Sequence, residues 1–237
     1  MSTAPPTAAP HLAAPRAAVP AAPAPRAPGA QPGGYKVQVS SSRALGATPP
    51  QTLSGAYVLE VGPAQATSNG ATQEESINLG SGGTFTSDLL FGNDGSVALT
   101  RITQTGGGEY PQPPLSPAPP IVVVPAALSA GQAWSGSFTS PVGNGSYTGS
   151  LQGPTSTAVG GRTLSVWTVT IHVSVAGTYD GYPYTATVDV RAGWSPDLRL
   201  FVSDHMDTHG QLNTLAGLPL FAVQGTLDAT LLSATPS

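Results

Sequence analysis

Residues 163–194, TLSVWTVTIHVSVAGTYDGYPYTATVDVRAGW, contain the pattern that decides the fold. Apolar and polar residues alternate at 167–175, and a second alternating run covers 182–192. A period of two is typical of a strand with one buried and one solvated face. Asp180-Gly181, between the two runs, is a turn signal whose backbone matches the twist of paired strands. The stretch therefore predicts an antiparallel β-hairpin.

The same turn predicts the register of the hairpin. With its two residues at the centre, Trp167 faces Trp194 on the apolar side and His172 faces Asp189 on the polar side. A slip of one residue would place every apolar side chain opposite a polar one, so the register is well specified. We expect both tryptophans to lie in the core rather than on a ligand-binding surface.

The composition excludes several classes of protein. Charged residues make up only 8 % of the 237 residues, about a third of the usual share, so Ser, Thr, Asn and Gln must supply most of the polar surface. The net charge of −4 argues against a nucleic-acid-binding protein, which needs a basic surface. The lack of Cys excludes disulfides, thiolate metal sites and cysteine nucleophiles. Such a composition is typical of neutral extracellular β proteins.

Residues 1–34 are rich in Ala and Pro and contain no apolar segment like that of a signal peptide. The apolar run Ile121–Val124 is far too short to span a bilayer, so no transmembrane segment is predicted. The chain is either cytosolic, or it follows a leader or anchor that is not present in this sequence. We favour the second, because Ala/Pro tails commonly hold a domain away from a membrane or cell wall. We therefore expect an extracytoplasmic protein, with 1–34 as a disordered spacer.

Outside the hairpin, every predicted element is a strand. Strands are predicted at 35–39, 53–61, 84–91, 96–103, 121–124, 132–140, 145–152, 198–202 and 220–232. Residues 62–72 are predicted to be a loop, Asn144-Gly145 a type I′ turn, and the Gly/Pro-rich residues 105–120 a bridge between two halves of the sheet. Because no segment of about ten residues has helical periodicity, we predict an all-β fold: a curved antiparallel sheet, sandwich or half-barrel, in one composite domain covering 35–237.

The strands at 84–91 and 96–103 are predicted to form a second hairpin. With residues 94–95 at the centre of its turn, Asp88 would lie opposite Arg101 and Leu90 opposite Leu99. Four consecutive turn-forming residues also allow a longer loop at this place.

Three short motifs resemble those of a known family. They are Phe91-Gly92-Asn93-Asp94-Gly95, then Leu128-Ser129-Ala130-Gly131-Gln132-Ala133-Trp134 after a Pro-rich bridge, and Trp194-Ser195-Pro196-Asp197-Leu198. In this order, over residues 89–199, the chain is similar to the TapB-like group of bacterial envelope domains of unknown function. The resemblance implies a curved antiparallel sheet, somewhat like the periplasmic lipoprotein carriers, and an envelope location, but no catalytic residues. The chain departs from the pattern in its Ala/Pro tail and in lacking a lipoprotein cysteine.

The densest set of metal-ligand side chains lies in residues 204–209, DHMDTH. Carboxylate and imidazole groups suit Zn²⁺ or Mn²⁺. On a strand, His205, Asp207 and His209 would share one face at steps of about 7 Å, too far apart to bind one ion unless the strand bends. Two interpretations remain open. In the first, a metal-dependent hydrolase binds its ion through Asp204, His205, Asp207 and His209. In the second, these four residues belong to the polar end of a strand and bind no metal.

Two other groups of residues are candidates for chemistry. Asp189 could orient His172 as a general base, but no nucleophile-elbow motif accompanies the pair, so we favour an ordinary cross-strand contact. Tyr179 and Tyr182, near the turn of the hairpin, are candidate ligand-binding residues, since exposed aromatic rings stack on sugars and anchor interfaces. The Gly-rich residues 80–83 are not followed by a helix, so no phosphate-binding loop and no cofactor are predicted.

The sequence thus predicts a non-enzymatic extracytoplasmic β domain on an Ala/Pro spacer, either structural or ligand-binding. The ligand would be a lipid or another apolar molecule, a glycan, or a cell-wall component. A carrier would need a large apolar pocket lined from both halves of the sheet. The alternative is the metal-dependent hydrolase, which would need at least three of the four metal candidates to converge in a cleft.

Overall fold

The computed structural model describes residues 29–106 and 114–237, and within them the predicted all-β fold is confirmed. The strands are β1 (Gly33–Leu45), β2 (Gln51–Val61), β3 (Gln65–Thr67), β4 (Gly70–Asn78), β5 (Thr84–Gly92), β6 (Val97–Thr105), β7 (Ile121–Val124), β8 (Ala133–Ser140), β9 (Gly143–Val159), β10 (Arg162–Tyr179), β11 (Tyr182–Ser195), β12 (Leu200–Asn213) and β13 (Pro219–Leu231). In the described part of the chain, the one helical element is a short 3₁₀ turn, η1 (Gly80–Gly82).

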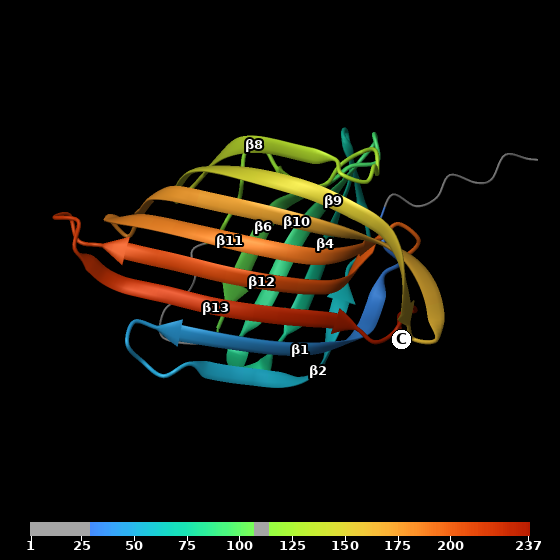
Figure 1. Cartoon of the computed structure of the whole chain (residues 1–237), viewed down its shortest axis with the longest axis horizontal. Coiled ribbons are helices and arrows are strands. Elements are labelled where there is room, and N and C mark those ends of the chain that lie inside the picture. Colours follow the sequence, from blue (N-terminus) through green and yellow to red (C-terminus); the bar gives the residue numbers. More distant parts are fainter. Residues whose placement is uncertain (1–28, 107–113) are drawn as a thin grey trace, which may run out of the picture.

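All the strands belong to one antiparallel sheet that curves into a nearly closed, barrel-like shape (Figure 1). Its order is β7-β6-β5-β4-β2-β1-β13-β12-β11-β10-β9-β8, with β3 paired to β4. Strands β8 to β13 form a broad front wall, and β4 and β6 lie behind it at a steep angle to the front strands (Figure 1). The first and last strands of the chain, β1 and β13, are paired from Val37 with Leu231 to Leu45 with Val223, so the two halves share one sheet.

The hairpin of β10 and β11 has the predicted register. Trp167 pairs with Trp194 and His172 with Asp189. Asp180 and Gly181, with φ values of 51° and 80°, adopt the left-handed backbone that a type I′ turn requires. Trp194 is 4 % exposed, and the partly buried Trp167 packs against the same core. Both tryptophans therefore belong to the hydrophobic interior.

The segment between β6 and β7 brings the two edges of the sheet together. Leu115 pairs with Ile102 of β6, and Ala118 pairs with Thr139 of β8 through two backbone hydrogen bonds of 2.8 and 2.9 Å. Part of the predicted Pro-rich bridge therefore spans the gap between the edge strands. Residues 107–113 of that bridge lie outside the described residues.

The interior is filled by two hydrophobic clusters. The first gathers side chains from β5 to β11, including Phe91, Tyr147 and Trp194. The second gathers side chains mainly from β1, β10, β12 and β13, including Tyr35 and Leu200. Inward and outward residues alternate along the strands, as expected for a sheet with one solvated face.

Three local predictions were wrong. Residues 62–72 were expected to be a loop, but they contain β3 and the start of β4. Asn144 pairs with Thr139 inside the β8–β9 hairpin, so the turn lies before it rather than at Asn144-Gly145. In the β5–β6 hairpin Asp88 pairs with Arg101 as predicted, but a bulge follows. Because of that bulge, the partner of Leu99 is Leu89 and not Leu90.

The predicted spacer, residues 1–34, lies outside the described residues as far as residue 28. From Gly29 onward the chain is packed, contrary to the prediction. Ala30 is 3 % exposed and its backbone N–H donates to the side chain of Gln73 at 2.8 Å, and Gly33 begins β1. Among the described residues, no helix has the length and hydrophobicity needed to cross a membrane.

Candidate functional site

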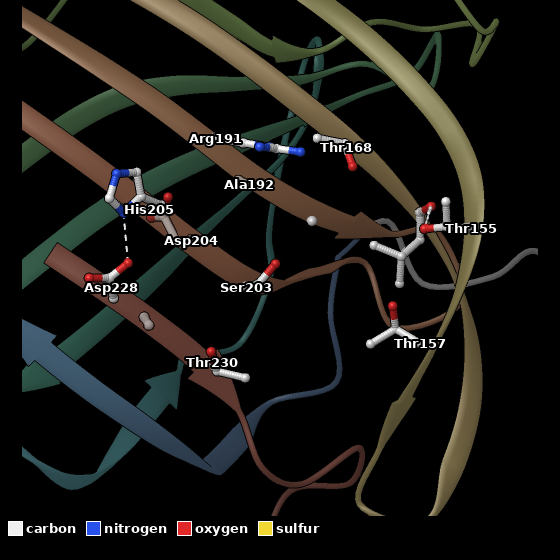
Figure 2. A pocket seen from close by; sticks show the side chains of 13 residues that line it. Thr155, Thr157, Thr168, Arg191, Ala192, Ser203, Asp204, His205, Asp228 and Thr230 are labelled. Atoms are coloured by element: carbon white, nitrogen blue, oxygen red, sulfur yellow. Dashed lines mark hydrogen bonds and ion pairs between the residues drawn. The ribbon is translucent and has the colours of Figure 1, made fainter.

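The candidate site is an open pocket of about 330 Å³ on the outer face of the sheet (Figure 2). It lies across β9 to β13, towards the end of these strands that is remote from the β10–β11 turn. It is lined by Thr155, Thr157, Val166, Thr168, Arg191, Ala192, Gly193, Ser203, Asp204, His205, Asp228, Ala229 and Thr230. Most of these residues carry hydroxyl or charged groups, so the pocket is polar.

Two neighbouring irregularities of the sheet create this pocket. The β9–β10 register shifts between Val166 and Thr168, and the β11–β12 register shifts just after Gly193. Such bulges bend a strand and increase its twist. Thr168 and Gly193 are cross-strand partners, so both distortions occur at one place. A Cβ at Gly193 would lie 2.6 Å from Ser203 Oγ, so a side chain at this position would require Ser203 to move.

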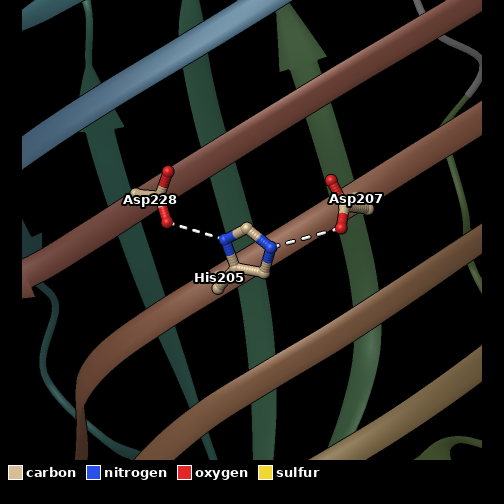
Figure 3. Close-up of polar contacts among 3 residues, drawn as sticks. All are labelled: His205, Asp207 and Asp228. Carbon is tan, nitrogen blue, oxygen red and sulfur yellow. Dashed lines mark hydrogen bonds and ion pairs between the residues drawn. The ribbon is translucent and has the colours of Figure 1, made fainter.

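His205 lies between two carboxylates at the rim of the pocket (Figure 3). Its Nδ1 is 2.6 Å from Asp228 Oδ1, and its Nε2 is 3.2 Å from Asp207 Oδ2. The hydrogen bond with Asp228 is the main cause that raises the pKa of His205, and Asp207 adds to it. With both nitrogens facing carboxylates, the protonated imidazole donates twice. Solvent screens these contacts, since about half of the His205 side chain is exposed.

Arg191 supplies a second cationic group. It is the cross-strand partner of His205, and in Figure 2 its guanidinium points toward Thr168. Within the described residues Arg191 forms no ion pair. Its planar set of N–H donors is therefore available to a ligand in the pocket.

A second His–Asp pair continues the polar pattern across the outer face. His172 Nδ1 lies 2.7 Å from Asp189 Oδ1, as the predicted register requires. Asp189 is in turn the cross-strand partner of Asp207. A His/Asp row, formed by His172, Asp189, Asp207, His205 and Asp228, therefore crosses β10 to β13. Each histidine in this row has a carboxylate partner, and no hydrogen bond joins either one to a hydroxyl among the described residues.

Asp204 points to the opposite side of β12 from His205. Its neighbours in the sheet are Ala192 and Ala229, and its Oδ1 is shielded from solvent without a hydrogen-bond partner. Burial raises the pKa of Asp204 to about 7; the charge of His205 lowers it and that of Asp228 raises it further. Asp204 is therefore an interior carboxyl group beneath the pocket.

Glu75 of β4 is a second interior carboxyl group, and the sequence did not point to it. It is 8 % exposed, and its Oε1 has no hydrogen-bond partner. Burial, together with the negative charge of Asp204, raises the pKa of Glu75 to about 7. β4 and β12 are separated in the sheet by β2, β1 and β13, so the two carboxyls approach each other across the interior.

The four predicted metal candidates do not form one cluster. His205, Asp207 and His209 project outward along β12, whereas Asp204 projects inward. Only His205 and Asp207 are in contact. Among the described residues, no group of three His, Asp or Glu side chains is spaced to hold a metal ion. The convergence that the metal-site interpretation requires is therefore not found among the described residues, because strand alternation separates Asp204 from the others.

The two predicted ligand-binding tyrosines differ in their surroundings. Tyr182 is 41 % exposed at the start of β11. Tyr179 is partly buried, packs against the first core cluster, and has its ring 6.5 Å from that of Tyr184. Neither tyrosine lines the pocket around His205. Their role in binding stays a prediction.

Sequence reasoning found His205 but not the hydroxyl groups around it. Thr155 and Thr157 lie in the extension of β9 past residue 152, where the predicted strand ended. Their proximity to Ser203 and Thr230 follows from the β9–β13 strand order, which alternation alone does not give. A usable signal was Gly193, an isolated glycine in a strand pattern, which often marks a bulge.

A second pocket, of about 340 Å³, lies at the start of the described chain. It is lined by Gly29, Ala30, Gln31, Pro32, Tyr35, Arg162, Asp197, Leu198, Arg199 and Ala234. Neither this pocket nor the one around His205 is a large apolar cavity lined from both halves of the sheet. Neither one therefore meets the requirement for an apolar carrier.

Comparisons with models of protein families, with curated proteins and with solved structures find no match to this chain. The resemblance to the TapB-like group therefore stays a prediction. The pocket and its neighbouring side chains are the basis for a functional assignment.

Proposed function

We propose that this protein is a non-enzymatic, extracytoplasmic binding domain that takes a glycan in the pocket around His205. The observation that carries the proposal is the lining of that pocket, in which hydroxyl groups from four strands occur together with the unpaired guanidinium of Arg191. Sugars offer many hydroxyls that both donate and accept hydrogen bonds, and Ser, Thr, Arg and Asp side chains complement them. A volume of about 330 Å³ also lies within the range of small-molecule sites.

A binding role fits the site better than a catalytic one. A general base needs a free nitrogen within hydrogen-bond reach of the proton it removes. The two nitrogens of His205 face Asp228 and Asp207 instead. Asp189 holds His172 through Nδ1, but among the described residues no hydrogen bond joins His172 to a hydroxyl that could act as a nucleophile. The metal-dependent hydrolase has no support from the arrangement, because Asp204 lies on the other side of the strand.

The extracytoplasmic location is part of the same proposal. It is supported by the sequence, in which charged residues are scarce and residues 1–34 are rich in Ala and Pro, as in spacers that hold a domain away from a membrane or cell wall. Secretion can be tested directly by expressing the intact gene with an epitope tag and fractionating the cells. Recovery of the tagged protein in the cytosolic fraction alone would contradict this part of the proposal.

Glycan binding can be tested with an array of neutral, amino and uronic oligosaccharides, followed by calorimetry on those that are retained. We expect retention of at least one class, and a loss of about tenfold or more in affinity in Arg191→Ala, because a bidentate charged contact is removed. Arg101→Ala is the matched control, since Arg101 is exposed on β6 and does not line the pocket. Absence of retention, or equal losses in both variants, would overturn the assignment.

A further inference from the structure

Three uncharged or nearly uncharged hairpin tips lie next to one another at one end of the sheet. They join β1 to β2, β12 to β13 and β10 to β11, and the order of the strands makes them neighbours (Figure 1). No charged residue occurs at 44–59 or at 210–227. In the third tip, 179–182, the one charged residue is Asp180. This end of the molecule therefore has almost no charge.

The central tip carries the most exposed large hydrophobic side chains of the described chain. Leu215 is 83 % exposed, Leu218 66 % and Leu220 51 %. Tyr182, on the neighbouring tip, is 41 % exposed. An isolated exposed leucine needs no explanation, but three within six residues beside an exposed tyrosine form an apolar patch. We call Leu215, Leu218, Leu220 and Tyr182 the apolar tip.

The turn that presents these leucines is closed by its own hydrogen bonds. The Thr214 N–H donates to the Leu218 carbonyl at 2.7 Å, and the Leu218 N–H donates to Thr214 Oγ1 at 3.0 Å. Gly217, with a φ of 82°, allows the chain to reverse and donates to the Thr214 carbonyl. The leucines are therefore held outward by an ordered turn, not left exposed by an irregular loop.

The shape and chemistry of the apolar tip fit a lipid surface better than a protein partner. The β12–β13 tip projects beyond the adjacent strand ends at this side of the sheet (Figure 1). The polar side chains within 210–227 are all uncharged, so the segment has no charged group to pair with a protein partner or with an anionic headgroup. Tyrosine is the residue type that sits at the level of lipid headgroups, with its ring in the apolar layer and its hydroxyl in water.

We propose that the apolar tip inserts into the surface of an electrically neutral lipid bilayer. The absence of Lys and Arg from the tip means that anionic lipid is not required, so insertion depends on apolar area alone. The pocket around His205 lies ten residues back along β12, at roughly 30 Å for a strand rise of about 3.3 Å. The docked domain would therefore present that pocket away from the membrane. The proposal does not depend on the identity of the pocket's ligand.

The test is co-flotation of the whole chain with phosphatidylcholine vesicles. We expect the protein to float with these vesicles, to the same extent at low and high salt. Replacing both Leu215 and Leu218 by Ser should lower the partition coefficient by about tenfold or more, because each leucine loses its apolar burial. Both side chains are largely exposed, so the double variant should keep its fold, as circular dichroism can verify.

Val58→Ser is the matched control. Val58 is 43 % exposed, but it lies in β2 near its pairing with β4, away from the apolar tip. An unchanged partition in this variant is required by the proposal. A Leu218→Trp variant adds a second readout. Because the native chain already contains three Trp, its fluorescence is compared with that of the native protein, and only the variant should shift to the blue on addition of vesicles.

Three results would overturn the proposal. The first is the absence of flotation, and the second is flotation that requires anionic lipid or disappears at high salt. The third is self-association in light scattering, without vesicle binding, that the double variant abolishes. That last result would assign the apolar tip to contact between two copies of the chain.

Discussion

At the scale of single residues, the interior carboxyl groups give the clearest pH dependence. Burial raises the pKa of Glu75 from an ordinary value of 4.5 to about 7. The folded protein therefore binds more protons than the unfolded chain between these pH values, and stability is lost as the pH rises through about 7. A shift of this size corresponds to roughly 3 kcal/mol. Asp204, whose pKa is also raised to about 7, contributes with the same sign.

We therefore expect Glu75→Gln to be more stable than the native protein at pH 8 and close to it at pH 5. The neutral amide removes the cost of a buried charge without changing the shape of the side chain. Urea unfolding across this pH range measures the difference. Glu74→Gln is the control, because Glu74 is the exposed neighbour on the same strand. An equal change in both variants, or no gain at pH 8, would show that Glu75 is not charged inside the fold.

His205 allows a second prediction at this scale. Its pKa is raised chiefly by the hydrogen bond with Asp228, so Asp228→Asn should lower it. A histidine whose pKa is raised above 6.5 contributes stability at lower pH, and that contribution is lost as the pH rises through the folded value. NMR titration of the imidazole resonances measures the shift. Asp189→Asn, which removes the partner of His172 instead, should leave the His205 titration unchanged.

The sequence predicted some of these residues and missed others for a physical reason. His172 and Asp189 were paired correctly, because alternation and the turn determine register together. Asp204 was grouped with His205 by proximity in sequence, although neighbouring strand residues face opposite sides. Glu75 was missed because a buried carboxylate breaks the apolar pattern that sequence reasoning uses to recognise the inner face.

At the scale of the strand, Gly193 is the residue on which the pocket depends. A Cβ at this position would lie 2.6 Å from Ser203 Oγ and 3.0 Å from Val166 Cγ1, so Gly193→Ala requires both neighbours to move. We expect a loss of about 1–3 kcal/mol in the free energy of unfolding, as for other overpacked sites. We also expect weaker binding of any glycan that the pocket retains. Thermal unfolding and calorimetry measure the two effects.

Gly210→Ala provides the comparison for this change. A Cβ at Gly210 would meet its nearest atoms, in Tyr184, at 3.7 Å, which is an ordinary contact. Both glycines lie in long strands in the middle of the sheet, so the effect of a Gly→Ala change on the backbone conformation of the strand should be similar at the two positions. If Gly210→Ala is as destabilising as Gly193→Ala, the close approach at the bulge is not what requires glycine.

Strands with a clear apolar alternation were predicted, and those without it were not. The hairpin of β10 and β11 was predicted with its register because its inner residues are nearly all apolar, although the register shift of β10 against β9 was not. The start of β4 fell within the predicted loop, 62–72, because that stretch is rich in Gly, Pro, Ser and Asn, and the rest of β4 was not predicted. Its buried positions include the polar residues Gln73 and Glu75, which break the apolar alternation. Gln73 tolerates burial because its amide is hydrogen-bonded to the backbone of Ala30 and Gly62. Such partners come from distant segments, so the local sequence does not reveal them.

At the scale of the whole molecule, the pairing of β1 with β13 joins the two ends of the described chain. Ser42 and Thr226 are direct partners, and the native sequence has no Cys to compete with an engineered bond. A variant with both residues replaced by Cys should form a disulfide on oxidation and gain roughly 2–4 kcal/mol in stability. Non-reducing electrophoresis and thermal unfolding measure this gain. Cys at Ser42 and Thr230, four residues out of register, should not cross-link readily.

The sequence predicted the fold class and a curved antiparallel sheet, but not how far the sheet closes. Closure depends on the segment at 115–118, where Leu115 and Ala118 bridge β6 and β8. That segment is rich in Pro, which argues locally against any strand pairing. The order of the strands likewise follows from long-range packing, which turn chemistry does not specify.

The measurement that tests the central claim most directly is an amide-resolved NMR titration of the whole chain with the oligosaccharide best retained on the array. The claim predicts that the perturbed amides cluster at Thr168, Arg191, Ser203, His205 and Thr230, around the pocket, and that Arg191→Ala suppresses these changes. Perturbations confined to Tyr179 and Tyr182, or no saturable change with any oligosaccharide, would contradict it.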